Sequence, residues 1–365
     1  MFSFIILTSI AVLLSFLSQN KKKDYLIYLS FAVLAGVMGL QDSISVDFPS
    51  YIKEFDDINR GVVKGVLIRS QEMRDTAIEY GWFLVNRIIG YIIPSFYVVS
   101  FTTSLFFCFS VARLIKDVVP TKYRWVATSY FVLSPMIFFM SAMRQAVAVG
   151  CFIFAVRSIL NKKKWYIPVL WLLAGSLFHN TLLIALLFLL LLLMPDKNKE
   201  LYVAGLCILF VVALFFGQQY KTEMLVFGLK FFSDNMDQYA SYMTEEESLA
   251  YSFRSLMRIA FPFVFTIIPM CKAKGKDFYY LLLFAVGQGL YGFVGFMGNL
   301  QRIAFYLTIF AVASFMVASN HIKNQLVNAF FIGGILLLNL YMFYVMLGNE
   351  QYVKFLHYRT IFYIF

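Results

Sequence analysis

Charged residues are scarce in this chain: of its 365 residues only 14% are Asp, Glu, Lys or Arg, whereas 61% are hydrophobic. A soluble domain usually has about 25% charged and about 45–50% apolar residues, so the composition excludes an ordinary cytosolic enzyme. The chain also lacks a phosphate-binding glycine loop, a nucleophile-elbow pattern and an HExxH motif. ATP-driven transport by this chain alone is therefore not expected.

Cysteine is also rare. The four cysteines, Cys108, Cys151, Cys207 and Cys271, lie inside or at the ends of apolar stretches. No two of them have the spacing of metal ligands. We expect neither a disulfide nor a zinc site, and no residue cluster that calls for another metal or a cofactor.

The chain is rich in apolar blocks, most of which are separated by short charged stretches. The blocks are roughly 15 to 22 residues long, close to the about 20 residues with which a helix crosses about 30 Å of hydrocarbon. The sequence therefore predicts an all-α fold, a polytopic transmembrane bundle of about twelve spans that forms a single integral membrane domain over residues 1–365. The expected helices are 2–18, 26–41, 95–115, 125–142, 146–160, 165–178, 181–195, 201–217, 254–270, 278–297, 301–319 and 326–347.

Three expected turns depend on the charges around long apolar stretches. Residues 165–195 carry no formal charge, and as one helix they would be about 46 Å long, too long for an upright span. Basic loops flank both ends of this stretch, so we expect it to turn back near His179 and Asn180. Arg144 marks a similar turn within 125–160, and residues 298–302 mark one within 278–319.

The net charge of +11 follows the expected membrane topology. Of the 31 basic and 20 acidic residues, we assign 17 basic and five acidic ones to the cytoplasmic face, which leaves 14 and 15 for the outer face. This asymmetry is the positive-inside pattern and does not indicate a nucleic-acid partner. It places both termini outside, with residues 2–17 as a retained helix and not a signal peptide.

Two segments, about 42–94 and 218–253, are longer than the other connections and fall on the outer face. They carry most of the charged side chains outside the cytoplasmic loops, and we expect short helices within them. Long loops in membrane proteins often carry function, so any chemistry is expected on the outer face.

Individual polar residues near the apolar blocks are site candidates, because an unpartnered charge there costs a few kcal/mol or more. Arg144 could pair bidentately with a phosphate or a carboxylate, or simply extend to water at the interface. His179 could accept a proton or bind a sugar, or be satisfied in helix packing, and Asn180 could cap the following helix. Arg302 follows glycine and amide residues that favour a water-filled cavity.

Carboxylates and two further arginines extend this set. Asp47 and Glu79 border the first long loop and could supply a base or orient sugar hydroxyls, or be solvated loop acids or helix caps. Arg254 and Arg258 are typical of the membrane edge, although one of them could serve an anion.

Four short motifs occur in a characteristic order on one expected side of the membrane. They are Asp-Phe-x-x-Tyr (Asp47, Phe48, Tyr51), Glu-x-Gly-aromatic (Glu79, Gly81, Trp82), Arg-Gln-x-x-Ala (Arg144, Gln145, Ala148) and Ala-x-x-x-Phe-His (Ala174, Phe178, His179). In this arrangement the chain, from about residue 25 to 320, resembles the EpsG family of bacterial exopolysaccharide polymerases, which are related in role to the Wzy polymerases.

The resemblance implies a GT-C-like membrane glycosyltransferase that needs no metal. Its substrate would be oligosaccharide repeat units linked to undecaprenyl diphosphate on the outer face of the bacterial plasma (inner) membrane. The growing chain would leave its lipid diphosphate for a hydroxyl of the next unit. Membrane lipid, and a flippase and a chain-length regulator of the same pathway, are the implied partners.

The resemblance also suggests roles for the candidate residues. Arg144 and Arg302, with Arg254 in reserve, would stabilise the leaving diphosphate, and Asp47, Glu79 and His179 compete as base. The remaining substrate-binding candidates are the aromatic residues Tyr51, Trp82 and Tyr239, which would stack on sugars, and the amides Gln145, Asn180 and Gln301.

Three other functions stay open: a flippase or transporter of the same lipid-linked units, a membrane O-acyltransferase, and an O-antigen-type ligase. A flippase should place charges along a path open to both sides, whereas these candidates are expected on one face. An acyltransferase would draw its donor from the cytoplasm, whereas His179 is expected outside.

Overall fold

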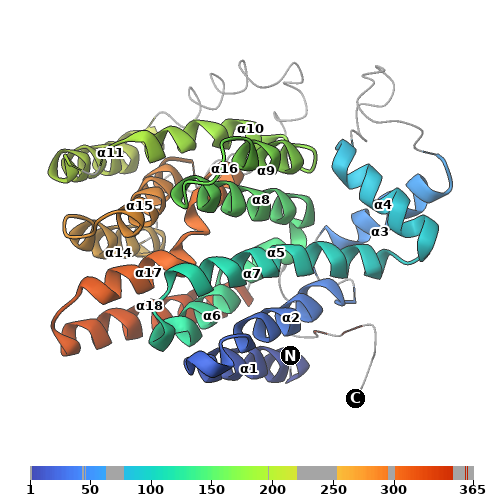
Figure 1. Cartoon of the computed structure of the whole chain (residues 1–365), viewed down its shortest axis with the longest axis horizontal. Helices are drawn as coiled ribbons and strands as arrows, with labels where there is room; N and C mark the ends of the chain where they lie inside the picture. The colour runs from blue at the N-terminus through green and yellow to red at the C-terminus, as the bar shows by residue number, and fades with distance from the viewer. Residues whose placement is uncertain are drawn as a thin grey trace. The chain divides into compact units, whose positions relative to one another are not determined.

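The computed structural model describes residues 2–42, 45, 47–62, 78–195, 197–219, 253–294, 301–347, 358 and 360. These residues form an all-α fold, as predicted (Figure 1). The β structure found among them is one isolated antiparallel bridge between Gln41 and Thr360. The chain divides into two compact units, unit 1 (Met1–Leu187 with Ala329–Phe365) and unit 2 (Phe188–Asn328). The single membrane domain over 1–365 stays a prediction.

Unit 1 contains the N-terminal half of the chain and most of the last long helix. Its helices are α1 (Phe2–Leu17), α2 (Leu26–Gly39), α3 (Phe48–Asn59), α4 (Tyr80–Ile92), α5 (Phe96–Val118), α6 (Arg124–Leu133), α7 (Pro135–Ser141), α8 (Met143–Leu160), α9 (Tyr166–Ser176), α10 (Thr181–Ala185) and α18 (Gln325–Leu347), with the 3₁₀ turns η1 (Lys21–Lys23) and η2 (Thr121–Tyr123). Helix α5 packs against α2 and α8, α2 also packs against α1, and α8 packs against α9.

Unit 2 is built around one central helix. Its elements are α11 (Lys199–Gln219), α14 (Phe253–Met270), α15 (Lys276–Val294), α16 (Gln301–Thr308) and α17 (Ala311–His321), preceded by most of the 3₁₀ segment η3 (Leu186–Leu193). Helix α15 contacts each of the other four. Every predicted apolar span therefore has a helical counterpart, although the number of membrane crossings stays a prediction.

Among the described residues, four helical segments are long and apolar enough to cross a membrane: Phe96–Val118, Met143–Leu160, Arg302–His321 and Gln325–Leu347. Shorter apolar helices accompany them, including Phe2–Leu17 and Leu26–Gly39. Many large apolar side chains stay exposed, such as Phe330 at 73%. Water would oppose such exposure and hydrocarbon would not, so the chain is a multi-pass membrane protein.

Two features show how the sequence shapes the bundle. The expected helix 125–142 is broken into α6 and α7 at Ser134, because Pro135 has no backbone N–H to continue the ladder. Helices α2 and α5 meet at Gly39, where an added Cβ would lie 2.5 Å from the Cα of Phe101. Only glycine allows the two backbones this approach.

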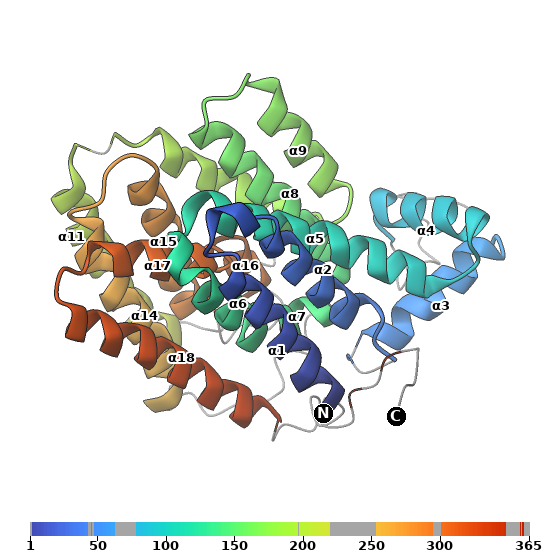
Figure 2. The ribbon, with the colours of Figure 1, turned by 60° about the horizontal axis from the view of Figure 1, so that its bottom comes forward.

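Helices α3 and α4 lie side by side at the N-terminal end of α5 (Figures 1 and 2). They are the short helices predicted for the first long segment. Helix α3 is amphipathic, with Phe48, Tyr51, Phe55 and Ile58 at helical spacing and buried. These residues form a core with Trp82 of α4 and with residues of α5. The second long segment lies almost entirely outside the described residues.

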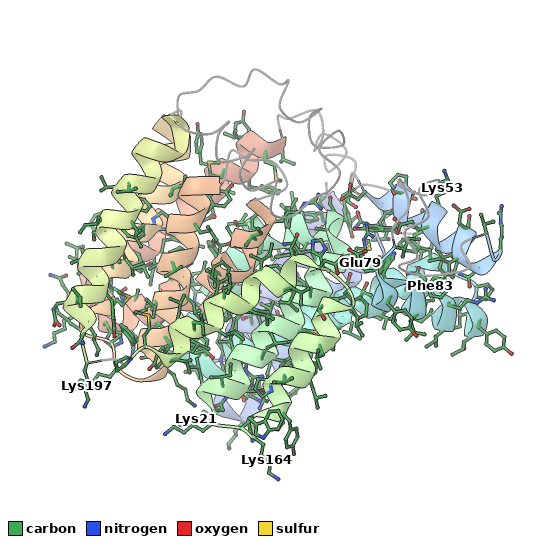
Figure 3. The ribbon with its side chains drawn as sticks, turned by 90° about the horizontal axis from the view of Figure 1, so that it is seen from above. Lys21, Lys53, Glu79, Phe83, Lys164 and Lys197 are labelled. Atoms are coloured by element: carbon green, nitrogen blue, oxygen red, sulfur yellow. The ribbon has the colours of Figure 1, made fainter. Side chains whose placement is uncertain are left out.

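Unit 1 has charged groups toward both of its ends. Figure 3 shows Lys21 and Lys164 at one end and Glu79 and Lys53 toward the other. At the Lys21 end, Asp24 pairs with Lys116 (2.6 Å) and with Arg124. The Lys21 end is the one that the sequence predicts to be cytoplasmic.

Candidate functional site

Six side chains from four separate segments meet at the Glu79 end of unit 1. The cluster consists of Tyr51 and Glu54 of α3, Glu79 and Trp82 at the start of α4, Arg144 in the first turn of α8, and His179 in the turn between α9 and α10. We call it the Glu79 cluster. Within the cluster, Glu54 and Tyr51 are the residues that α3 contributes.

Arg144 is the cationic centre of the cluster. Its Nη1 donates to Glu79 Oε2 at 2.6 Å, and its Nη2 lies 3.8 Å from Glu54 Oε1. The guanidinium carbon lies 5.4 Å from the centre of the Tyr51 ring, within cation–π range. The three charged side chains are 15–26% exposed, so both ion pairs are partly shielded from water and interact more strongly than surface pairs.

His179 contacts the other oxygen of Glu79. Its Nδ1 lies 3.3 Å from Glu79 Oε1. An ionised carboxylate only accepts hydrogen bonds, so Nδ1 carries the hydrogen and, in the neutral ring, Nε2 is left as an acceptor. Nε2 is buried and has no hydrogen-bond partner among the described residues. This orientation of an imidazole by a carboxylate is the arrangement of a general base.

Glu54 is held by α4 as well as by Arg144. The indole N–H of Trp82 donates to Glu54 Oε2 at 2.8 Å. The Trp82 ring packs on Tyr51, with ring centres 5.1 Å apart, and both rings are buried. In this arrangement protein atoms cover the ring faces that would stack on sugars. The stacking role of these two residues stays a prediction.

The environment shifts the acidities of the cluster in different directions. Burial alone would raise the pKa of Glu79, but the hydrogen bond with His179 and the charge of Arg144 hold it below its usual value. Burial raises the pKa of Glu54, and Arg144 offsets this only in part. Burial also raises the pKa of Tyr51 to about 12, so that its hydroxyl stays protonated. Of the two carboxylates in the cluster, Glu79 therefore favours its charged form more strongly than Glu54 does.

A close backbone approach sets the distance between Glu79 and His179. The N–H of Gly81 donates to the carbonyl of Leu177 at 2.7 Å. A Cβ on Gly81 would lie 2.8 Å from that same oxygen and 2.9 Å from the Phe178 ring. The Glu-x-Gly motif thus lets the start of α4 touch the α9–α10 turn.

The start of α8 is fixed by residues that follow α2. Gln41 donates to the carbonyls of Met38 (3.0 Å) and Met140 (3.2 Å), and its side-chain oxygen accepts from the N–H of Ser45. The Ser45 hydroxyl also donates to the Met140 carbonyl, at 3.2 Å. Since Met140 lies in the last turn of α7, these bonds position the α7–α8 connection that precedes Arg144.

The predicted site residues of unit 1 fall into two groups. Tyr51, Glu79, Trp82, Arg144 and His179 are brought together in the cluster. Outside it, Asp47 is the partly buried residue that precedes α3, and its charge raises the pKa of Tyr51 and Glu54. Gln145 is buried in α8 at 2% exposure, and Asn180 is exposed and caps no helix through its side chain.

The remaining predicted residues lie in or near unit 2. Gln301 and Arg302 begin α16, and Arg254 lies in the first turn of α14. Tyr239 lies outside the described residues. Their predicted roles stay predictions.

Two residues of the arrangement were not predicted. Glu54 is one acid among several on an amphipathic loop helix, a pattern typical of a solvated face. Gln41 is the last residue of the expected apolar helix 26–41. For Glu54 the available signal was its position one turn after Tyr51, which places both side chains on the same face of α3. Among the described residues, no three His, Cys, Asp or Glu side chains gather as a metal-ligand set.

In a comparison with known protein families, the model of the EpsG family matches residues 24–360, which confirms the resemblance seen in the motifs. No curated protein and no solved structure matches the chain.

Proposed function

We propose that this protein is a polysaccharide polymerase. The chain belongs to the EpsG family, and membership of that family suggests a membrane protein of exopolysaccharide biosynthesis. The polymerase joins undecaprenyl-diphosphate-linked oligosaccharide units on the outer face of the bacterial plasma membrane. Both termini lie on that face. The pathway's flippase and a chain-length regulator are the expected partners.

The reaction is a glycosyl transfer without a metal. A hydroxyl oxygen of the incoming unit attacks the anomeric carbon of the growing chain and forms the new glycosidic bond. The bond from that carbon to the lipid diphosphate breaks, and undecaprenyl diphosphate leaves with the bonding electrons. The hydroxyl proton passes to a base of the protein. Each cycle lengthens the chain by one unit.

The observation that carries the proposal is the orientation of His179 by Glu79. Transfer to a hydroxyl needs a base within hydrogen-bond reach of its proton. His179 Nε2 is the acceptor nitrogen of an imidazole whose Nδ1 contacts Glu79 Oε1 at 3.3 Å. Arg144 holds Glu79 from its other oxygen at 2.6 Å, which keeps the carboxylate ionised. Of the three predicted bases, His179 takes the proton, and Glu79 orients it and stabilises the imidazolium.

The leaving diphosphate needs cationic stabilisation. The arginines named for this role are Arg144, Arg302 and Arg254. Arg302 and Arg254 each stand in the first turn of a helix of unit 2. Arg144 stands in the cluster itself.

The charge distribution of unit 1 supports chemistry on the outer face. The Glu79 cluster lies toward the end opposite Lys21 and Lys164 (Figure 3). Lysine-rich loops face the cytoplasm in most membrane proteins. The cluster then faces outward, where lipid-linked units are joined after they have been flipped.

A deletion strain tests the proposal. We expect it to accumulate single lipid-linked units on the outer leaflet, and we expect long polymer to return with the wild-type gene but not with a His179→Ala gene expressed at the same level. Accumulation of the units on the inner leaflet would instead identify a flippase. Full restoration by His179→Ala would remove His179 from the reaction.

A further inference from the structure

We infer that the Glu79 cluster binds the acceptor saccharide through a hydroxyl group, and that the leaving diphosphate is bound by cations elsewhere in the protein. The inference rests on the proposed function. It assigns the acceptor hydroxyl and the lipid diphosphate of that reaction to two separate binding sites. It changes the role of Arg144 from a phosphate ligand to the group that organises the acceptor site.

The first support is that carboxylates already occupy Arg144. Its two terminal nitrogens face different partners, Glu79 at 2.6 Å and Glu54 at 3.8 Å. A bidentate arginine–phosphate pair uses two of the five guanidinium N–H groups. A phosphate at Arg144 would therefore either displace a carboxylate, which would then remain partly buried without its counter-ion, or lie directly beside both carboxylates.

The second support is the charge balance. Two carboxylates face one guanidinium, so with a neutral His179 the cluster carries one excess negative charge. Asp47 adds to the negative potential at Glu54. A diphosphate brings at least one further negative charge per phosphate, and the side chains are too buried for water to screen the repulsion. A neutral saccharide meets no such barrier.

The third support is the match between the free groups and hydroxyls. His179 Nε2 is buried and unpartnered within the described part of the chain, yet the side chain as a whole is 16% exposed. A buried acceptor without a donor is unfavourable, and a sugar hydroxyl supplies that donor. Carboxylate oxygens of Glu54 and Glu79 accept from neighbouring hydroxyls in the same way, since each oxygen has two lone pairs.

The burial of the aromatic rings fits this assignment. Trp82 and Tyr51 are the buried members of the cluster, with side-chain exposures of 0% and 4%. Trp82 holds Glu54 through its indole N–H. These rings therefore set the positions of the carboxylates, and the carboxylates and His179 make the contacts with the saccharide. Asn180 follows His179 in the chain and is exposed, and in this assignment its amide contacts the same saccharide.

Two binding measurements on the full-length protein in lipid nanodiscs test the inference. The saccharide probe is the repeat-unit oligosaccharide from the deletion strain, released from its lipid by mild acid. The diphosphate probe is farnesyl diphosphate. The variants are Arg144→Gln and the near-isosteric Glu79→Gln, with Arg113→Gln at the opposite end of unit 1 as a matched control.

We expect each cluster variant to weaken saccharide binding at least about tenfold, as the loss of a charge-assisted hydrogen bond does. We expect farnesyl diphosphate binding to stay within about twofold of wild type, and Arg113→Gln to change neither. Weaker farnesyl diphosphate binding by Arg144→Gln, or tighter binding by Glu79→Gln, would overturn the inference. Unchanged saccharide binding in both cluster variants, or none in the wild type, would overturn it too.

The proposed function is tested separately with the same wild-type preparation and intact lipid-linked units. If no polymer forms, the proposed function fails. If polymer forms but the binding measurements give one of the overturning results above, only the assignment of the cluster to the acceptor fails.

Discussion

Gly81→Ala is a small change whose effect follows directly from the geometry. The added methyl carbon would lie 2.8 Å from the Leu177 carbonyl oxygen and 2.9 Å from the Phe178 ring. Neither the backbone oxygen nor the ring can tolerate such contacts, so the start of α4 must move away from the α9–α10 turn. Overpacking of this kind costs about 1–3 kcal/mol. The Gly81–Leu177 hydrogen bond would add about 1 kcal/mol if it were lost.

The effect on activity should be larger than the effect on stability. Glu79 stands two residues before Gly81, and its 3.3 Å contact with His179 is already at the long limit of a hydrogen bond. A shift of a few tenths of an ångström breaks it, and a misplacement of about 1 Å can cost about a hundredfold in rate. We therefore expect polymer formation to fall at least about tenfold while the protein remains folded.

The assay compares Gly81→Ala with Gly36→Ala, both expressed in the deletion strain and purified for thermal unfolding. An added Cβ at Gly36, in α2, meets nothing within 4 Å. Alanine there should leave activity unchanged and alter stability by less than about 1 kcal/mol, in the stabilising direction. If Gly81→Ala behaves like Gly36→Ala in both measurements, the close approach does not position the site.

Two further predictions concern single contacts, and a third concerns the membrane topology. Trp82→Phe replaces the buried indole with a smaller phenyl ring and removes the N–H that donates to Glu54. It should cost at least about 1.5–3 kcal/mol in the free energy of unfolding, the value of a hydrogen bond to a charged group, with the cost of the lost ring volume added. A neutral result would mean that the bond with the carboxylate contributes nothing. Arg124→Met removes a 6% exposed arginine that donates to Asp24 and to the Ser18 carbonyl, and it should cost about 1.5–3 kcal/mol, because Asp24 keeps Lys116 as a partner. Arg113→Met removes a 41% exposed arginine and should cost less than about 1 kcal/mol. Equal costs would contradict the burial argument. A cysteine at Tyr80 should react with an impermeant maleimide on intact cells and one at Lys164 only after permeabilisation, in a background without the native cysteines; the reverse labelling would invert the topology.

The sequence predicted the helical segments because apolar length and flanking charge are local properties. Residues 165–195 were expected to turn at His179, and α9 ends at Ser176 while α10 begins at Thr181. The break at Pro135 was not predicted, although proline in an apolar helix is a known signal. The distribution of the chain into two packed units depends on long-range contacts that no local pattern shows.

The sequence named five residues of the cluster without their contacts. Glu79 meets Arg144 and His179 across sequence separations of 65 and 100 residues, whereas the order of the motifs placed the three only on the same side of the membrane. The Glu-x-Gly-aromatic motif did not show that Trp82 is buried, because an aromatic side chain on a short loop helix can face either a bound sugar or the protein core. Nor did the sequence pattern show Glu54, because the side chain's role depends on which face of α3 packs on α4.

The central claim is that this protein forms glycosidic bonds between lipid-linked units, and reconstitution tests it most directly. Purified full-length protein in liposomes is mixed with single lipid-linked units from the deletion strain. The account predicts polymer and the release of one undecaprenyl diphosphate for each bond formed, with loss of both in His179→Ala. Movement of intact units across the bilayer without any joining would contradict it.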